Sequence, residues 1–113
     1  MTSVKSTTTA NKVLVVDDHA AARESVADVL RHVGYDVSGL GSPMEALPRL
    51  EHEAFDLVIT DLQMPGMDGL EFIREIRQRR VKTQVLMITA HATISSAVEA
   101  MRQGAFDYLE KPF

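Results

Sequence analysis

Several short apolar runs in this chain end at residues that could hold a metal ion or a phosphoryl group. The residues are three carboxylates, a hydroxyl and an ammonium: Asp17, Asp18, Asp61, Thr89 and Lys111. In an open parallel sheet, ligands bind just beyond the carboxyl ends of the strands. If each apolar run is a strand of one such sheet, we expect these five side chains to meet at one edge.

That set of side chains has a definite chemistry. Two or three carboxylates at close range repel one another unless a cation neutralises them, and hard oxygen ligands suit Mg²⁺ or Mn²⁺. A carboxylate can also attack phosphorus and become an aspartyl phosphate. The metal and a lysine would neutralise charge on the transferring oxygens, while a hydroxyl could hydrogen-bond one of them. The pattern therefore favours cation-dependent phosphorylation of a carboxylate.

Strands and helices alternate between these residues. Continuous apolar runs predict buried strands over 13–16, 57–60 and 85–88, with weaker strands over 35–40 and 106–110. The intervening segments have helical spacing, so the order is βαβαβαβαβ. Such alternation predicts an α/β fold with helices on both faces of a parallel sheet. We expect a doubly wound, flavodoxin-like sheet of five strands in the order 2-1-3-4-5.

Two helices carry more specific expectations. Pro48 falls inside the second helix, where a proline removes a hydrogen bond and should kink or break the helix at a cost of about 3 kcal/mol. The last helix has the clearest amphipathic pattern, with apolar residues at Ile94, Ala97, Val98 and Met101.

Composition limits the classes of protein that the chain could belong to. With 113 residues, one domain is expected. The chain has no cysteine, which excludes disulfides and thiolate metal sites. A net charge of −4 argues against direct nucleic-acid binding. Its apolar runs fall far short of the roughly 20 residues that span a bilayer, so we expect no membrane association and a cytoplasmic location. The polar residues 1–11 predict a disordered tail.

Four motifs, in this order, resemble those of the receiver domain of bacterial two-component response regulators. They are Val15-Val-Asp17-Asp18, Thr60-Asp61-Leu-Gln-Met-Pro-Gly-Met-Asp-Gly69, Ile88-Thr89-Ala90 and Lys111-Pro-Phe113. The resemblance covers residues 12–113. From Thr89 onward the chain is most similar to nitrogen-regulation-type regulators, in which an ATPase module and a DNA-binding helix-turn-helix follow the receiver.

The resemblance implies a role for each metal-binding and phosphate-binding residue. Asp61 would be the phosphoacceptor and would also contact the metal. Asp18 would bind Mg²⁺ directly and Asp17 mostly through water. The backbone carbonyl of Gln63 would be a further ligand of the metal.

The remaining implied roles concern switching. Thr89 and Lys111 would contact the phosphoryl group, and Thr89 would move toward it. Tyr108 would then fill the space that Thr89 vacates, changing the face formed by the fourth helix and the last strand. His91 and Gln63 would flank the phosphoryl group and tune its lifetime.

The resemblance also implies partners. A sensor histidine kinase or a phosphotransfer protein would donate the phosphoryl group, and the receiver would phosphorylate and dephosphorylate itself without turning over a free substrate. The output would be control of a further domain and of transcription. Receivers continue into a fifth helix, whereas this chain ends at Phe113, so we expect that helix to be missing. Part of the sheet face beside the first helix would be uncovered, and the chain could form a homodimer there.

Other interpretations of the same residues remain open. Each acidic residue alone could be a helix cap or a solvated loop residue, and Tyr108 could be a static core residue. His19 is most simply a solvent-exposed side chain. The whole domain could be a degenerate receiver that docks without phosphorylation. It could also be a Mg²⁺-dependent phosphohydrolase, although Asp17-Asp18 lacks the Asp-x-Asp spacing of such enzymes.

Overall fold

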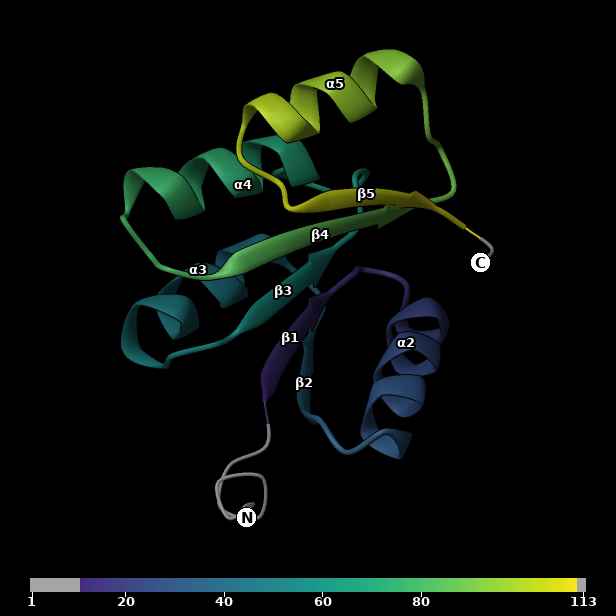
Figure 1. Ribbon diagram of the computed structural model, residues 1–113, viewed down its shortest axis with the longest axis vertical. Helices are drawn as coiled ribbons and strands as arrows, with labels where there is room; N and C mark the ends of the chain where they lie inside the picture. Colours follow the sequence, from purple (N-terminus) through teal and green to yellow (C-terminus); the bar gives the residue numbers. More distant parts are fainter. Residues whose placement is uncertain (1–10, 112–113) are drawn as a thin grey trace, which may run out of the picture.

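A computed structural model describes residues 11–111 as one parallel sheet flanked by helices (Figure 1). The elements, in chain order, are β1 (Lys12–Val16), α2 (Ala20–His32), β2 (Asp36–Leu40), α3 (Pro43–His52), β3 (Leu57–Thr60), α4 (Gly69–Gln78), β4 (Gln84–Thr89), α5 (Ile94–Arg102) and β5 (Asp107–Glu110). The five strands are parallel in the order β2-β1-β3-β4-β5, which confirms the expected topology. The expected tail at residues 1–11 lies almost wholly outside the described residues.

The helices begin and end where local side chains satisfy their backbone groups. Asp68 accepts a hydrogen bond from the backbone of Glu71 and Glu71 returns one, forming a capping box at the start of α4. Thr93 and Ser96 form the same arrangement at the start of α5. Gly34, which follows α2, has φ +103°, a conformation that glycine adopts without steric cost.

The expected break at Pro48 is wrong, because α3 runs without interruption from Pro43 to His52. Pro48 is exposed, while Ala46, Leu47 and Leu50 on the other side of the helix are buried. The carbonyl that loses its partner is that of Met44, whose side chain is also exposed. Burial of the apolar side of α3 therefore holds the helix together, and water can satisfy the freed carbonyl.

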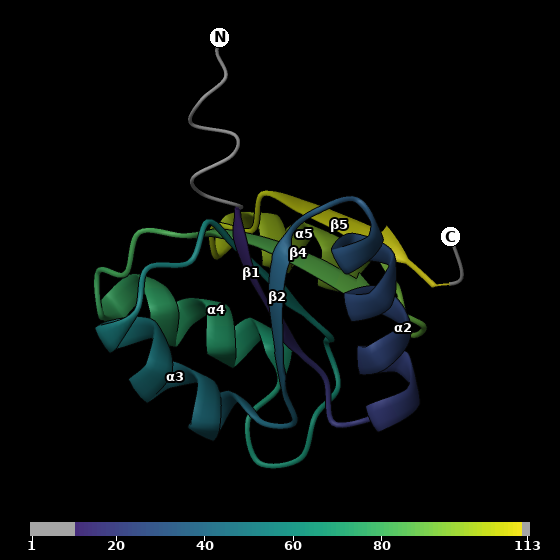
Figure 2. The ribbon, with the colours of Figure 1, turned by 90° about the horizontal axis from the view of Figure 1, so that it is seen from below.

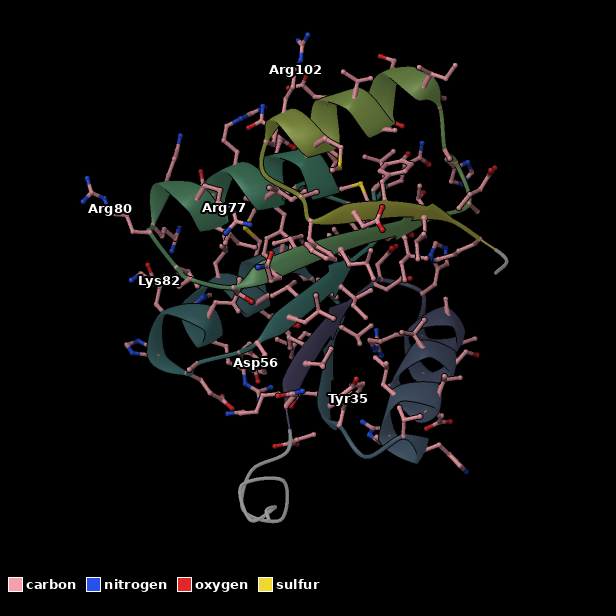
Figure 3. The ribbon with its side chains drawn as sticks, viewed as in Figure 1. Tyr35, Asp56, Arg77, Arg80, Lys82 and Arg102 are labelled. Atoms are coloured by element: carbon pink, nitrogen blue, oxygen red, sulfur yellow. The ribbon has the colours of Figure 1, made fainter. Side chains whose placement is uncertain are left out.

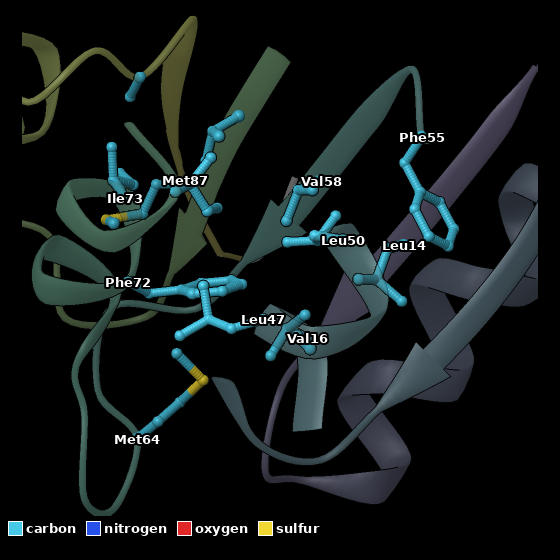
Figure 4. Packing of buried hydrophobic residues seen from close by; sticks show 14 of the residues in the cluster. Leu14, Val16, Leu47, Leu50, Phe55, Val58, Met64, Phe72, Ile73 and Met87 are labelled. Carbon is cyan, nitrogen blue, oxygen red and sulfur yellow. The ribbon is translucent and has the colours of Figure 1, made fainter. Parts of the chain in front are cut away.

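The two faces of the sheet are covered unequally. Helices α3, α4 and α5 cover one face and enclose the larger core, in which Phe72, Ile73 and Met87 are completely buried (Figure 4). Helix α2 covers the other face and packs Ala27 against the sheet. Figure 2 shows α2 on the side of β1 and β2 opposite to α3 and α4.

An apolar groove of about 440 Å³ lies on the α2 face of the sheet, beside that helix. Ile59, Leu86, Ile88 and Leu109 of the sheet line it together with Val26 and other residues of α2. The expectation that part of the sheet beside the first helix is uncovered is thus confirmed for residues 11–111. None of the helices described in this range is long and apolar enough to cross a membrane.

The expected apolar face of the last helix is only partly buried. Helix α5 forms as predicted, but Ile94 is 87% exposed and Val98 and Met101 are about half-exposed. Ala100 supplies its fully buried contact instead.

Candidate functional site

The first acidic pair follows β1, a strand whose last four residues are buried. The backbone N–H of Asp17 donates to Leu40 of β2, and its side chain is 92% buried. Asp17 Oδ1 accepts a hydrogen bond from the backbone of His19 (3.0 Å), and the carbonyl of Asp17 accepts one from Arg23 (2.8 Å). The loop between β1 and α2 is therefore fixed on both sides, which directs the pair toward the neighbouring strand end.

Asp61 follows β3, the central strand next to β1. Its backbone N–H donates to Val16, and its side chain is 93% buried. Oδ1 accepts a hydrogen bond from the backbone of Leu62 at 2.6 Å. Gly69, the first residue of α4, packs so closely that a Cβ there would lie 2.3 Å from the carbonyl oxygen of Asp61. Only glycine allows the loop after β3 to fold back in this way.

Asp17, Asp18 and Asp61 converge as the sequence predicts, since one ligand atom from each lies within 4.8 Å of the others. His19 contributes a ring nitrogen to the same cluster. The prediction of a solvent-exposed His19 is correct for most of its side chain, which is 73% exposed, but it missed the approach of the ring to the carboxylates. Nothing in the sequence pattern sets the direction of that ring.

Lys111 reaches this cluster from the end of β5. Its Nζ lies 3.0 Å from Asp17 Oδ2 and 3.6 Å from Asp61 Oδ2. Its backbone N–H donates to the carbonyl of Thr89, which ties the end of β5 to the end of β4. Two buried carboxylates thus share one ammonium, which offsets part of the cost of keeping them ionised away from water.

Thr89 ends β4 and is completely buried. The register of β3 and β4 pairs Thr60 with Met87, so Thr89 stands at the same edge of the sheet as Asp61. The hydroxyl of Thr89 accepts a hydrogen bond from the backbone of His91 at 3.1 Å.

Tyr108 lies in β5 and is partly buried. Its hydroxyl lies 2.5 Å from the hydroxyl of Ser96 in α5. Ser96 also belongs to the capping box of that helix, so Tyr108 is linked to the start of α5. The sequence analysis did not identify Ser96, because a serine in the first turn of a helix carries no sign of a partner 12 residues away.

Gln63 and His91 are exposed residues of the loops after β3 and β4. Each lies two positions beyond a buried residue of the site, Asp61 and Thr89 respectively. The roles expected for them, a carbonyl ligand and tuning of the phosphoryl group, stay predictions.

The opposite edge of the sheet has a different character. Figure 3 shows Arg80, Lys82 and Asp56 near the amino-terminal ends of the strands. Near that edge, hydrogen bonds from Arg49 and then Lys12 hold the pKa of Glu53 below its ordinary value. The acidic cluster is the place in residues 11–111 where several carboxylates meet in a cation-binding geometry. Its oxygen-rich donor set fits a hard divalent ion.

Comparison with known proteins agrees with this geometry. Residues 13–113 match the family described as the response regulator receiver domain. The chain is 50% identical to the response regulator protein FleR of Pseudomonas aeruginosa over 92% of its length, and 40% identical to the DNA-binding transcriptional regulator NtrC of Escherichia coli over 89%. It belongs to the response regulator receiver domain family of two-component systems, and its relatives place it with the NtrC type.

Solved structures with the same fold have comparable similarity. FixJ-N has a TM-score of 0.85 and 35% identity, covering 91% of this chain and 82% of that one. The beryllofluoride-activated NtrC4 receiver domain dimer has a TM-score of 0.84 and 34% identity, covering 90% and 84%. A response regulator from Burkholderia pseudomallei with a phosphorylated aspartic acid, a calcium ion and citrate has a TM-score of 0.84 and 31% identity, covering 91% and 61%.

The chain spans about a fifth of the length of FleR and of NtrC, since the matches cover 22% of each. By name, NtrC is a DNA-binding transcriptional regulator and FleR is a response regulator protein.

Proposed function

We propose that this domain is a phosphorylation-controlled switch in which Asp61 accepts a phosphoryl group in a Mg²⁺-dependent reaction. The observation that carries the proposal is the cluster at the carboxyl edge of the sheet, where Asp61 lies within 4.8 Å of Asp17 and Asp18 and 3.6 Å from Lys111. A cation would offset the repulsion among the carboxylates around Asp61, and the ammonium of Lys111 can bind phosphoryl oxygens.

Each residue of the cluster has a part in the reaction. Asp61 Oδ2 is the oxygen that attacks phosphorus, since Oδ1 is engaged by the backbone of Leu62. As this oxygen–phosphorus bond forms, the bond from phosphorus to the donor's histidine nitrogen breaks and the donor leaves as free histidine. Asp18, Asp17 and the backbone carbonyl of Gln63 would hold the metal together with Asp61, Asp18 directly and Asp17 mostly through water. When bound, Mg²⁺ neutralises charge that develops on the transferring oxygens.

Lys111 and Thr89 bind the phosphoryl group once it is on Asp61. Lys111 is already at the site, held by Asp17 and by its backbone bond to Thr89. Thr89 is buried at the neighbouring strand end and moves toward the new oxygens. Tyr108 then leaves its contact with Ser96, and the start of α5 changes position.

The donor is a phosphohistidine on a sensor histidine kinase or a phosphotransfer protein, and the domain works in the cytoplasm without turning over a free substrate. Its output is control of transcription through further domains. The proposal is supported by the similarity to NtrC and by the phosphorylated aspartic acid in the Burkholderia pseudomallei neighbour. The NtrC4 receiver dimer supports a homodimer as one assembled form.

The test is phosphorylation by acetyl phosphate with Mg²⁺, followed by intact mass. Wild type should gain the mass of one phosphoryl group, and Asp61→Asn should gain none. Asp68→Asn is the matched control, because asparagine caps a helix as well as aspartate does, so α4 should survive and the mass gain should persist. A mass gain in Asp61→Asn equal to that of wild type would contradict the proposal.

A docking module that works without phosphorylation is the alternative function. It predicts no mass gain in any variant and no need for Lys111. The ammonium held 3.0 Å from Asp17 Oδ2 favours the switch, because a docking surface has no use for a buried charge pair of this kind.

A further inference from the structure

Arg23 of α2 is tied to the loop that carries the acidic pair. Its Nη1 donates a hydrogen bond of 2.8 Å to the backbone carbonyl of Asp17. In residues 11–111 it forms no ion pair with a carboxylate, unlike Arg31 and Arg49. A guanidinium, which is charged at every physiological pH, is thus directed at a main-chain oxygen.

That oxygen belongs to the peptide unit that joins Asp17 to Asp18. A peptide unit is planar, so a hydrogen bond to its oxygen also fixes the N–H of Asp18 at the other end of the plane. Among the residues that the structure describes, the side chain of Asp18 makes no hydrogen bond, and its polar contact is the ring of His19 at 3.4 Å. The bond from Arg23 therefore fixes the plane from which Asp18 projects.

Two glycines at the end of β2 leave room for the arginine. A Cβ at Gly39 would lie 3.2 Å from both Cγ and Cδ of Arg23, and a Cβ at Gly41 would touch Nη1 at 3.4 Å. Neither glycine has a positive φ, so the backbone conformation does not require glycine at these positions. The missing side chains instead form a slot, through which the stem of Arg23 reaches the carbonyl of Asp17.

The length of the side chain in this slot is that of arginine. The Nζ atom of a lysine stands where arginine has Cζ, one bond short of Nη1. Arg23→Lys would therefore keep the positive charge but fall short of the Asp17 carbonyl. Gly39→Val would keep the arginine and close the slot. Neither change alters the net charge near the acidic pair.

We propose that Arg23 is a positioning residue of the acidic cluster, which orients Asp18 toward the metal ion by holding the peptide between Asp17 and Asp18. It touches none of the reacting groups and acts through the main chain of the loop. The use of Asp18 as a metal ligand rests on the proposed function, whereas the contact made by Arg23 does not. Groups that support a metal ligand typically contribute about 10–100-fold to metal affinity.

Calorimetric titration with Mg²⁺ tests the inference in wild type, Arg23→Lys and Arg31→Lys. Arg31 is the matched control, because it is also an arginine of α2 that donates to a backbone carbonyl, that of Val37 near the start of β2. We expect Arg23→Lys to weaken Mg²⁺ binding about tenfold and Arg31→Lys to change it by less than about twofold. A loss of affinity in Arg23→Lys cannot come from removal of a positive charge, since the charge is retained and its removal would favour cation binding.

Gly39→Val tests the slot. It should weaken Mg²⁺ binding by about the same factor as Arg23→Lys, because both changes break the same contact. The double variant Arg23→Lys, Gly39→Val should then bind Mg²⁺ about as well as the weaker single variant. Losses that multiply in the double variant would contradict a shared cause and overturn the inference.

Two further measurements separate positioning from a merely structural role. The amide nitrogen of Asp18 belongs to the peptide that Arg23 holds, so in the metal-free protein its nitrogen-15 resonance should shift in Arg23→Lys and not in Arg31→Lys. At saturating Mg²⁺, acetyl phosphate should phosphorylate Arg23→Lys within about threefold of the wild-type rate, because only metal binding is impaired. An unchanged Mg²⁺ affinity in folded Arg23→Lys, or equal losses in Arg23→Lys and Arg31→Lys, would overturn the inference.

The two proposals fail separately. If Arg23→Lys shifts the Asp18 amide and weakens Mg²⁺ binding, but acetyl phosphate adds no mass to wild type, the switch is wrong and the positioning role stands. If Asp61 is phosphorylated in wild type and Mg²⁺ affinity does not depend on Arg23, the switch stands and the inference is wrong.

Discussion

Lys111 and Asp17 are separated by 94 positions in the chain, yet Lys111 Nζ lies 3.0 Å from Asp17 Oδ2. Lys111 follows β5, and its contact with Asp17 closes the acidic cluster on that side. The strands β1 and β5 are not neighbours, because β3 and β4 lie between them in the sheet. The same ammonium lies 3.6 Å from Asp61 Oδ2, so it contacts both buried carboxylates. In the proposed switch, Lys111 would bind the phosphoryl group and would compete with the metal for the carboxylates.

Lys111→Met should separate these two effects. Phosphorylation by acetyl phosphate should slow by about 10²–10³-fold, the usual cost of losing a donor that stabilises transferred charge. Mg²⁺ affinity should rise by about threefold to tenfold, because a competing positive charge leaves the site. Intact mass and calorimetry measure the two quantities. Lys82→Met is the control, since Lys82 lies at the opposite edge (Figure 3). Unchanged phosphorylation in a folded Lys111→Met would contradict the role of the lysine.

Tyr108 and Ser96 should be coupled in the unphosphorylated protein. A double-mutant cycle with Tyr108→Phe and Ser96→Ala, measured by urea unfolding, should give a coupling free energy of about 0.5–1.5 kcal/mol, as for a neutral hydrogen bond. The coupling should fall after phosphorylation if Tyr108 moves as the proposed switch requires. Tyr35→Phe, at the other and more exposed tyrosine, should show no coupling to Ser96. Equal coupling in both states would argue that Tyr108 is static.

His91→Ala should lengthen the life of the phosphoryl group. His91 is exposed two residues beyond Thr89, to which its backbone donates a hydrogen bond, so its ring can meet water that approaches the site. We expect decay to slow by about twofold to tenfold, less than the full effect of a general base. Release of phosphate from the purified phosphorylated domain measures the rate. His52→Ala should decay as wild type does, and an unchanged decay time in His91→Ala would sink the prediction.

Gly69→Ala should disturb Asp61 directly. The added methyl group would lie 2.3 Å from the carbonyl oxygen of Asp61 and 2.7 Å from Met87. The free energy of unfolding should fall by about 1–3 kcal/mol, and phosphorylation should slow. In Gly39→Ala the new methyl group meets the flexible side chain of Arg23 at 3.2 Å, so a smaller loss is expected. Urea unfolding of the two variants makes the comparison, and equal losses would contradict the importance of the close approach.

Glu53 should contribute stability that depends on pH. Hydrogen bonds from Arg49 and Lys12 lower its pKa from 4.5, so the ionised form is favoured in the folded state. Its contribution is complete above the unfolded pKa and is lost as pH falls through the lowered folded pKa. Glu53→Gln should be less stable than wild type at pH 7, and the difference should vanish in acid and shrink in high salt. Thermal unfolding across pH measures this, with exposed Glu45→Gln as the control.

Much of this protein follows from its sequence. Continuous apolar runs identified β1, β3 and β4, and their alternation with helical segments implied a parallel sheet. Once the strands are parallel, the residues that end them must lie at one edge, so the convergence of Asp17, Asp18 and Asp61 needs no further information. These are consequences of local periodicity and chain direction, which a single sequence contains.

The tertiary structure decided where individual side chains point and which faces are covered. The ring of His19, the contact between Ser96 and Tyr108, and the exposure of Ile94 depend on the distance between elements, which no local pattern encodes. The intact helix around Pro48 has the same origin, because burial of the opposite side of α3 outweighs a local preference to break. Sequence pattern determined the elements and their order, whereas long-range packing determined the orientation of the side chains that carry the chemistry.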